Sequence, residues 1–242
     1  MPPHAQTQHL KEGVMAINVV EKIDGFVKVR HVIVSVSNKS GLESFIPSLL
    51  EINPKIRLFS TGGTYSRITE ILGDRASSCL TPVSDYTGQP ETQGGLVKTL
   101  DFKIYLGLLT ETYNDAHQQD LQRTGAVPVD MVVVNLYPFK ETISKEGVTV
   151  EQARGNIDIG GPCMIRASAK NFIRVAPVVD PSDYTRIISE MKANQGKISL
   201  KLRYELAEKA FEHTAVYDRH IADFLAGKSF DDISNCYQIM EG

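Results

Sequence analysis

The chain has 242 residues, of which 42% are hydrophobic and 23% are charged, as in ordinary soluble globular proteins. Its net charge of −3 gives no broad attraction to nucleic acid or to an anionic membrane, and it has no apolar run long enough to span a bilayer. The three cysteines, Cys79, Cys163 and Cys236, are odd in number and far apart, which argues against a disulfide scaffold. We therefore expect a cytoplasmic protein with neither a nucleic-acid nor a membrane partner.

The histidines do not predict a metal site. None of the six lies at a metal-site spacing from a cysteine. His213 and His220 are seven residues apart on a predicted helix and share a face, but this pattern is more typical of surface or packing histidines. We expect no bound metal.

Apolar segments with the period of a strand alternate along the chain with segments of helical period. Residues 1–28 are only weakly periodic and are interpreted as an N-terminal extension, followed by a domain over 29–228 and a tail over 229–242. The β-branched run HVIVSVS at 31–37 predicts a buried strand, and the apolar spacing within 39–53 predicts a helix. The same reasoning predicts further strands at 55–61, 129–139 and 174–180, and further helices at 64–73, 181–196 and 199–227.

This alternation predicts an α/β fold with a mostly parallel sheet and right-handed crossovers. Ligands of such sheets bind outside the carboxyl ends of the strands. The residues that directly follow each predicted strand are therefore the first candidates for a functional site.

Two neighbouring strand ends carry residues that suit an anion. Ser37-Asn38-Lys39 follows the first strand, and Thr61-Gly62-Gly63-Thr64 stands between the second strand and a helix. Unpaired N–H groups at a helix N-terminus bind phosphate, glycines allow close approach, and hydroxyls and a lysine add donors. The alternative is that the glycines only form a turn and the threonines only cap the helix. Ser37 and Lys39 at the neighbouring strand end favour a phosphate site.

Two later loops carry further candidates. Lys98 and Thr99 lie in a polar loop over 89–103, where a long loop is often functional, although a solvated lysine is the commoner case. Asn135 and Tyr137 follow the 129–139 strand in the motif NLYPF. Asn135 can read a base edge with its donor and acceptor, whereas Tyr137 is equally consistent with core packing.

The segment NIDIGGPCMIRASAKN, residues 156–171, combines an acid, two glycines and a helix start. Asp158 is either a functional carboxylate or a helix cap. Arg166 and Lys170 share one helix face and can simply be solvated. A lysine in a closed pocket near another cation would have a lowered pKa and could serve as a general acid.

Six motifs occur in an order and spacing that resemble one enzyme family: SVSNKSG, STGGT, GGLVKTL, NLYPF, IDIGGPCMIRASAKN and KAFEHTAVYD. Between about residues 31 and 226 the chain resembles the cyclohydrolase half of the bifunctional AICAR transformylase/IMP cyclohydrolase. The resemblance implies a methylglyoxal-synthase-like fold, with a mostly parallel sheet flanked by helices and with helices at the C-terminal end. It also implies ring closure and dehydration of FAICAR to IMP, the last step of de novo purine biosynthesis.

The resemblance also implies roles for individual residues. The substrate phosphate would be held by Ser37, Asn38, Lys39, Thr61, Gly62, Gly63 and Thr64. The loop of Lys98 and Thr99 would approach the substrate, and Asn135, Asp158 and Ile159 would contact the base. Lys98, Tyr137, Asp158 and Lys170 correspond to the family's catalytic group, with Lys170 as proton donor. The expected ligands are FAICAR, IMP and related purine ribonucleotides, without a cofactor. A homodimer and a separate AICAR transformylase are the expected protein partners.

The chain departs from the family pattern near the substrate loop. Leu96 stands where the family has arginine, Asp101-Phe102 replaces His-Pro, and Phe172 replaces a histidine. Lys103 or Arg123 is a candidate replacement for the missing cation. A purine-nucleotide-binding module of the same fold, with little or no catalysis, is therefore the alternative to an active enzyme. Methylglyoxal synthase is a weaker alternative, because Asn38 stands where a carboxylate base would be needed.

Overall fold

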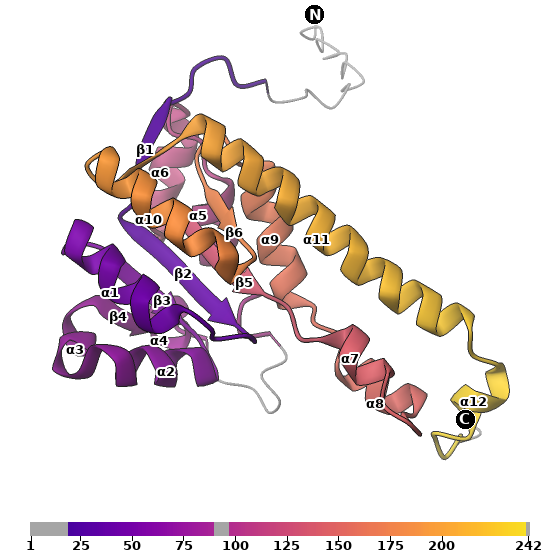
Figure 1. The fold of residues 1–242 in the computed structure, drawn as a ribbon. Helices are drawn as coiled ribbons and strands as arrows, with labels where there is room; N and C mark the ends of the chain where they lie inside the picture. The colour runs from indigo at the N-terminus through magenta and orange to yellow at the C-terminus, as the bar shows by residue number, and fades with distance from the viewer. Residues whose placement is uncertain (1–18, 90–96, 241–242) are drawn as a thin grey trace, which may run out of the picture.

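The fold was analysed in a computed structural model that describes residues 19–89 and 97–240 (Figure 1). The strands are β1 (Phe26–Lys28), β2 (His31–Val36), β3 (Arg57–Ser60), β4 (Leu80–Pro82), β5 (Met131–Asn135), β6 (Ala176–Val178) and β7 (Lys197–Ser199). The helices before β5 are α1 (Leu42–Ile52), α2 (Gly62–Leu72), η1 (Gly73–Arg75), α3 (Ala76–Cys79), α4 (Val83–Thr87), α5 (Phe102–Leu109) and α6 (Asp115–Thr124). Those after β5 are α7 (Phe139–Ile143), α8 (Val150–Gly155), α9 (Gly160–Lys170), η3 (Pro181–Asp183), α10 (Tyr184–Ala193), α11 (Leu200–Ala226) and α12 (Phe230–Ser234).

The main sheet has five parallel strands in the order β4-β3-β2-β5-β6. Its register pairs Val34 with Ser60 and Val36 with Asn135, so β2, β3 and β5 end at the same edge. Helices flank the sheet, and the long α11 follows at the C-terminal end (Figure 1). The predicted fold class is confirmed.

The alternation of side chains along the strands divides the core between the two faces of the sheet. Val32, Val34 and Val36 of β2 lie in the cluster that includes α1, α2 and α10. Ile33 points the other way, into the cluster that includes α5, α9 and α11. Because both faces of the sheet are covered, the sequences of β2 and β5 are almost continuously apolar and do not alternate between apolar and polar residues.

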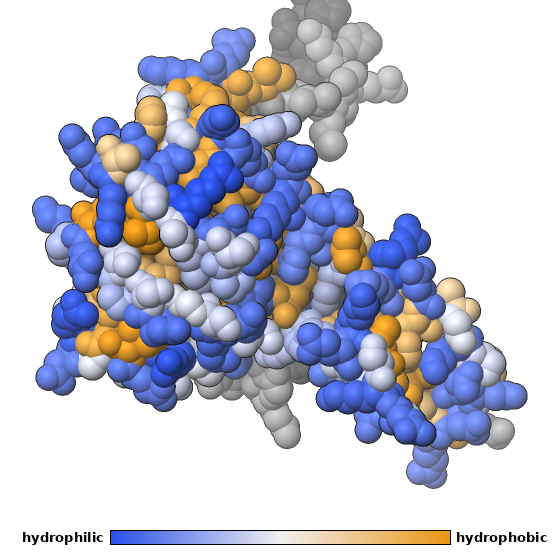
Figure 2. All heavy atoms as spheres, in the orientation of Figure 1, coloured by the Kyte–Doolittle hydropathy of each residue, from blue (hydrophilic) through white to orange (hydrophobic). Residues whose placement is uncertain are grey.

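A helical arm projects from this α/β core. The C-terminal half of α11 extends beyond the sheet, where α7, α8 and α12 accompany it (Figure 1). Phe139 of α7 packs edge-to-face against Phe224 of α11, with ring centroids 6.0 Å apart. Figure 2 shows that the exterior on this side is mainly hydrophilic, with smaller hydrophobic areas on the core and on the arm.

The predicted extension and tail both contain regular structure. Phe26–Lys28 forms β1 and pairs antiparallel with β7, and the carbonyl of Asp24 accepts a hydrogen bond from the buried Arg203. Residues 26–28 therefore belong to the folded unit, a point that a three-residue strand is too short to reveal by periodicity. Residues 1–18 lie outside the described part, and α12 lies within the predicted tail.

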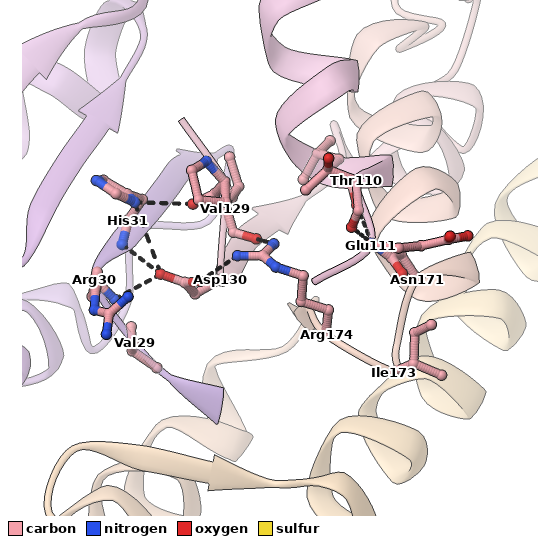
Figure 3. A network of polar contacts seen from close by, with 12 residues as sticks. Val29, Arg30, His31, Thr110, Glu111, Val129, Asp130, Asn171, Ile173 and Arg174 are labelled. Atoms are coloured by element: carbon pink, nitrogen blue, oxygen red, sulfur yellow. Dashed lines mark hydrogen bonds and ion pairs between the residues drawn. The ribbon is translucent and has the colours of Figure 1, made fainter. Parts of the chain in front are cut away.

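A buried polar network joins the amino ends of β2 and β5 (Figure 3). One carboxylate oxygen of Asp130 accepts from the backbone N–H groups of Arg30 and His31, and the other accepts from Arg174 at 2.6 Å. Arg174 also donates to the carbonyl of Val129 at 2.6 Å. The buried charges of Asp130 and Arg174 are thus met by each other and by backbone groups.

Candidate active site

A cavity of about 560 Å³ lies at the carboxyl ends of β2, β3 and β5. Its size falls within the range typical of small-molecule sites. The N-termini of α2 and α9 both lie at its wall, so the partial positive charges of two helices reach it. Of the predicted site residues, the structure brings these to the cavity wall: Ser37, Lys39, Thr61, Gly62, Gly63, Thr64, Lys98, Thr99, Asn135, Tyr137, Asp158 and Ile159.

Two lysines meet the start of α2. A Cβ built on Gly62 would lie 3.3 Å from Nζ of Lys98, and one built on Gly63 would lie 4.0 Å from Nζ of Lys39. The φ of +46° at Gly62 also favours glycine there. The N–H groups of Gly62 and Gly63 precede the first helical hydrogen bonds of α2, which both end on the carbonyl of Thr61. Two ammonium groups and free amide donors therefore converge at one place, as an anion site requires.

The hydroxyls of Thr61 and Thr64 contact other groups of the protein. The Thr64 hydroxyl donates to the carbonyl of Val36 and accepts from its N–H, so it ties α2 to the end of β2. The Thr61 hydroxyl lies 3.0 Å from that of Ser35, and no side-chain cap bond forms at Thr61. In this geometry the proton of the Thr64 hydroxyl is donated to Val36, and a phosphate contact by Thr64 stays a prediction.

Asn135 holds the loop after β2 in place. Its side-chain oxygen accepts from the N–H of Asn38 at 2.8 Å, and its amide nitrogen donates to the carbonyl of Asn38 at 2.9 Å. The side-chain oxygen of Asn38 in turn accepts from the N–H of Ser40. Asn135 therefore holds the loop after β2 in place, and its contact with a base stays a prediction.

At the opposite end of the cavity, side chains lie very close to two glycines, Gly160 and Gly161. A Cβ on Gly160 would lie 2.3 Å from the Thr99 hydroxyl, and one on Gly161 would lie 2.7 Å from an oxygen of Asp158. A side chain at either position would force these neighbouring side chains to shift. Asp158 accepts from the N–H of Gly161 at 2.8 Å, which places a carboxylate at the start of α9.

Asp158 is the desolvated acid of the cavity. Burial raises the pKa of its carboxyl above the ordinary value, although hydrogen bonds from Gly161 and Tyr137 act in the opposite direction. A carboxylate with a raised pKa is a better proton acceptor near neutral pH. Tyr137 and Ile159 beside it are each 58% exposed, so both side chains are accessible to a ligand.

Lys170 is not brought to the cavity of its own chain. It is exposed at the last turn of α9, about 15 Å along the helix from Gly160 at 1.5 Å per residue. It also lies about 120° around the helix axis from Met164, which lines the cavity. Arg166 and Lys170 lie on one exposed face of α9, as predicted, and that face points away from this cavity.

Neither candidate replacement for the family's arginine enters the cavity. Lys103 donates to the carbonyl of Tyr86 at 3.2 Å, and Arg123 pairs with Asp120 on α6. In the described part of the chain neither of them supplies a cation to the cavity wall. Position 96 lies outside the described residues.

The other two departures have structural explanations. Asp101 caps α5 by accepting from the N–H of Lys103 at 2.7 Å. Phe172 packs edge-to-face against Tyr204 of α11, with ring centroids 5.4 Å apart. Both residues therefore fit their local surroundings in the part of the chain that the structure describes.

A second cavity of about 350 Å³ adjoins the first. The two share Thr61, Gly62 and Lys98, and Tyr65 and Val83 add apolar wall to the second. The larger cavity alone contains Asp158, so it is the one that combines the cations with a carboxylate.

Sequence reasoning missed Tyr217. Its hydroxyl accepts from the N–H of Asp158 at 2.8 Å across 59 residues of sequence. The available signal was its place in the motif KAFEHTAVYD, to which no role had been given. Among the described residues, no group of three or more His, Cys, Asp or Glu side chains gathers as a metal site requires. None of the described helices is long and apolar enough to cross a membrane.

Two protein-family models match parts of the chain. Residues 41–163, just over half of the chain, match the model of the MGS-like domain. The chain belongs to this family. The C-terminal residues 168–240 match the model of the AICARFT/IMPCHase bienzyme. The resemblance drawn from the six motifs is thereby confirmed at the level of the family.

Individual relatives agree with this assignment of an MGS-like domain. The chain is 45% identical over 197 residues to the bifunctional purine biosynthesis protein PurH of Bacillus subtilis (strain 168). It is 48% identical over 197 residues to the PurH protein of Thermoanaerobacter sp. (strain X514). Each match covers 81% of this chain but only 37% of the relative. The crystal structure of ForH is similar with a TM-score of 0.68 and 28% identity, covering 81% of this chain and 99% of that one.

Proposed function

We propose that this MGS-like domain is an IMP cyclohydrolase of purine biosynthesis, which closes FAICAR to IMP with loss of water. The observation that carries the proposal is one cavity that holds an anion cradle at α2 and a desolvated carboxylate at α9. The similarity to two PurH proteins supports the same role.

The cradle determines how the substrate would lie. Lys39, Lys98 and the N–H groups of Gly62 and Gly63 would bind the phosphate, because charge-assisted bonds to phosphate are the strongest available here. The base would then extend toward Asp158 and Ile159 at the other wall. This orientation places the reacting groups of FAICAR at the carboxylate end.

Ring closure is intramolecular, so the first task of the site is to hold the reactive conformation. The carboxamide nitrogen attacks the formyl carbon, a C–N bond forms, and the formyl oxygen becomes a tetrahedral oxyanion. Asp158 accepts the proton that the nitrogen loses. Tyr137 is the O–H donor at the carboxylate end that lowers the energy of the oxyanion, and the positive charge of Lys98 across the cavity adds to this stabilisation. The oxygen takes up two protons and leaves as water, the C–O bond breaks, and the former formamide nitrogen releases its own proton as the C=N double bond of the ring forms.

Lys170 is the fourth member of the proposed catalytic group, as the proton donor to the leaving oxygen. Since it lies outside the cavity of its own chain, this role requires a second copy of the chain to bring it to the site. A homodimer is therefore part of the proposal. The chain spans 37% of the length of the two PurH proteins that it matches. From the family resemblance we also propose that a separate AICAR transformylase supplies FAICAR and that the reaction takes place in the cytoplasm.

A second candidate is a purine-nucleotide-binding module with weak or no catalysis. It is favoured by the small number of cations in the site. In the described part of the chain, the cations that line the cavity are Lys39 and Lys98. Lys103 and Arg123 are bonded elsewhere. Loss of one charge-assisted contact of about 3 kcal/mol made only in the transition state would lower the rate roughly a hundredfold.

The deciding experiment is an assay of the purified protein with FAICAR, in which IMP is followed by ultraviolet absorbance. We expect IMP formation by the wild type, and loss of turnover with nucleotide affinity retained in Lys170→Ala. Arg166→Ala, one turn earlier on the same exposed face, is the matched control and should remain active. No IMP, with IMP still binding by calorimetry, would favour the binding module. Normal turnover of the Lys170→Ala variant would remove Lys170 from the catalytic group.

A further inference from the structure

The motif KAFEHTAVYD contains a tyrosine that touches the candidate catalytic acid without lining the cavity. Tyr217 lies on α11 and is only 7% exposed. Its hydroxyl accepts from the backbone N–H of Asp158 at 2.8 Å. The contact joins the projecting helix to the turn that precedes α9.

The Asp158 turn has few other fixed points. The Asp158 side chain accepts from Gly161, which belongs to the same turn and therefore moves with it. The contact from Tyr217 comes instead from a different element, 59 residues away. The Asp158 carboxyl also accepts a backbone hydrogen bond from Tyr137, so the contribution of Tyr217 is to tie the backbone N–H of Asp158 to α11.

The ring of Tyr217 packs against other aromatic side chains. It packs edge-to-face on Phe139, with centroids 6.1 Å apart, and Phe139 packs on Phe224 in the same way. Phe139 begins α7 directly after Tyr137-Pro138, and its N–H donates to the carbonyl of Tyr137 at 2.8 Å. The same aromatic cluster thus supports the segments that carry Tyr137 and Asp158.

We propose that Tyr217 is a positioning residue, whose hydroxyl holds the Asp158 turn so that the carboxylate stays at the cavity wall facing the substrate. This inference rests on the proposed cyclohydrolase function for its consequence on rate, while its geometric part concerns Asp158 alone. Tyr137 beside Asp158, Tyr217 behind it, and Lys39 and Lys98 across the cavity are the titratable groups around this carboxylate.

Tyr217→Phe removes the hydroxyl and retains the ring. We expect kcat to fall about tenfold, the equivalent of one neutral hydrogen bond, while KM changes little because the phosphate cradle is not altered. Release of the turn toward water should also move the titration midpoint of Asp158 down toward the ordinary value, since burial is what raises it. A role in stability alone would lower the melting temperature and leave both quantities unchanged.

The test combines steady-state kinetics with a carbon-13 NMR titration of the aspartate carboxyls, in which Asp158→Asn identifies the Asp158 signal. Tyr204→Phe, at an exposed tyrosine of the same helix, is the matched control and should resemble wild type. A Tyr217→Phe protein with unchanged kcat and an unchanged Asp158 midpoint overturns the proposal.

Two further outcomes are distinguishable. A wild type that forms no IMP contradicts the proposed function, and the NMR titration then decides the positioning role by itself. Should Tyr217→Phe fail to fold, Phe139→Leu loosens the ring while keeping the hydroxyl, and the same two readouts apply to it. Wild-type values of both in Phe139→Leu would count against the aromatic support of Tyr217.

Discussion

The two ends of the central strands gather charged side chains in opposite ways. At the amino ends, Asp130 and Arg174 are buried and bonded to each other and to nearby backbone (Figure 3). At the carboxyl ends, Lys39 and Lys98 face a cavity, and within the described residues neither has an ion pair. A charge satisfied by the protein stabilises the fold, whereas a charge left without a partner is available to a ligand. The comparison teaches that the state of pairing, more than the residue type, separates the structural end of this sheet from the candidate functional end.

The largest effect is expected at the structural end. Asp130→Ala would leave Arg174 buried without its partner and the N–H groups of Arg30 and His31 without their acceptor. We expect a loss of about 3–5 kcal/mol in the free energy of unfolding, measured by urea denaturation. Asp120→Ala, which breaks an exposed pair with Arg123, is the control and should cost no more than about 1 kcal/mol. Equal losses in the two variants would contradict the contrast between the ends.

The functional end should respond in the opposite sense. Lys39→Ala and Lys98→Ala each remove a cation that has no ion pair among the described residues, although Lys39 donates to the carbonyl of Ser37 at 3.3 Å, so the free energy of unfolding should change by no more than about 1 kcal/mol. Loss of a charge-assisted phosphate contact of about 1.5–3 kcal/mol should raise KM roughly 10- to 150-fold. Lys55→Ala, at an exposed lysine before β3, serves as control. An unaltered KM in Lys39→Ala would remove that residue from the phosphate site.

The smallest effect concerns pH. Because burial raises the pKa of Asp158 in the folded chain, the folded state binds that proton more tightly than the unfolded state does. The contribution of this group to stability is therefore favourable at low pH and decreases as pH rises through the interval between the two pKa values. We expect Asp158→Asn to lose that slope in a series of denaturation curves. The wild-type rate should fall on the acid side at a pH above the ordinary carboxyl pKa, since a protonated Asp158 cannot accept a proton.

Much of the fold was predictable because its signals are local. The β-branched run at β2 and the helical spacing in α1 and α10 each identify an element without any tertiary information. The parallel sheet followed from their alternation, and with it the edge at which the site lies. The pairing of β1 with β7 was missed because three residues carry no usable period.

The sequence predicted which residues gather at the candidate site, but not which hydrogen bonds their side chains form. Asn135 suits a base edge and a backbone clamp equally well, and only its contact with Asn38 separates the two. The Thr64 hydroxyl presents the same ambiguity. The direction in which Lys170 points depends on how α9 lies on the sheet, and the contact of Tyr217 depends on a pairing across 59 residues. Such long-range choices are not encoded in any short stretch of sequence.

The central position of β2 has a consequence for synthesis on the ribosome. Its neighbour β3 follows within about 30 residues, but Val32 pairs on its other side with Met131, which is translated 99 residues later. At about 5–20 residues per second, one edge of this strongly apolar strand waits roughly 5 to 20 seconds for its partner. During that interval the nascent chain presents an open strand edge of the kind that pairs with other chains. Yield in cells should therefore depend on translation speed and on chaperone capacity more than the stability of the finished domain would suggest.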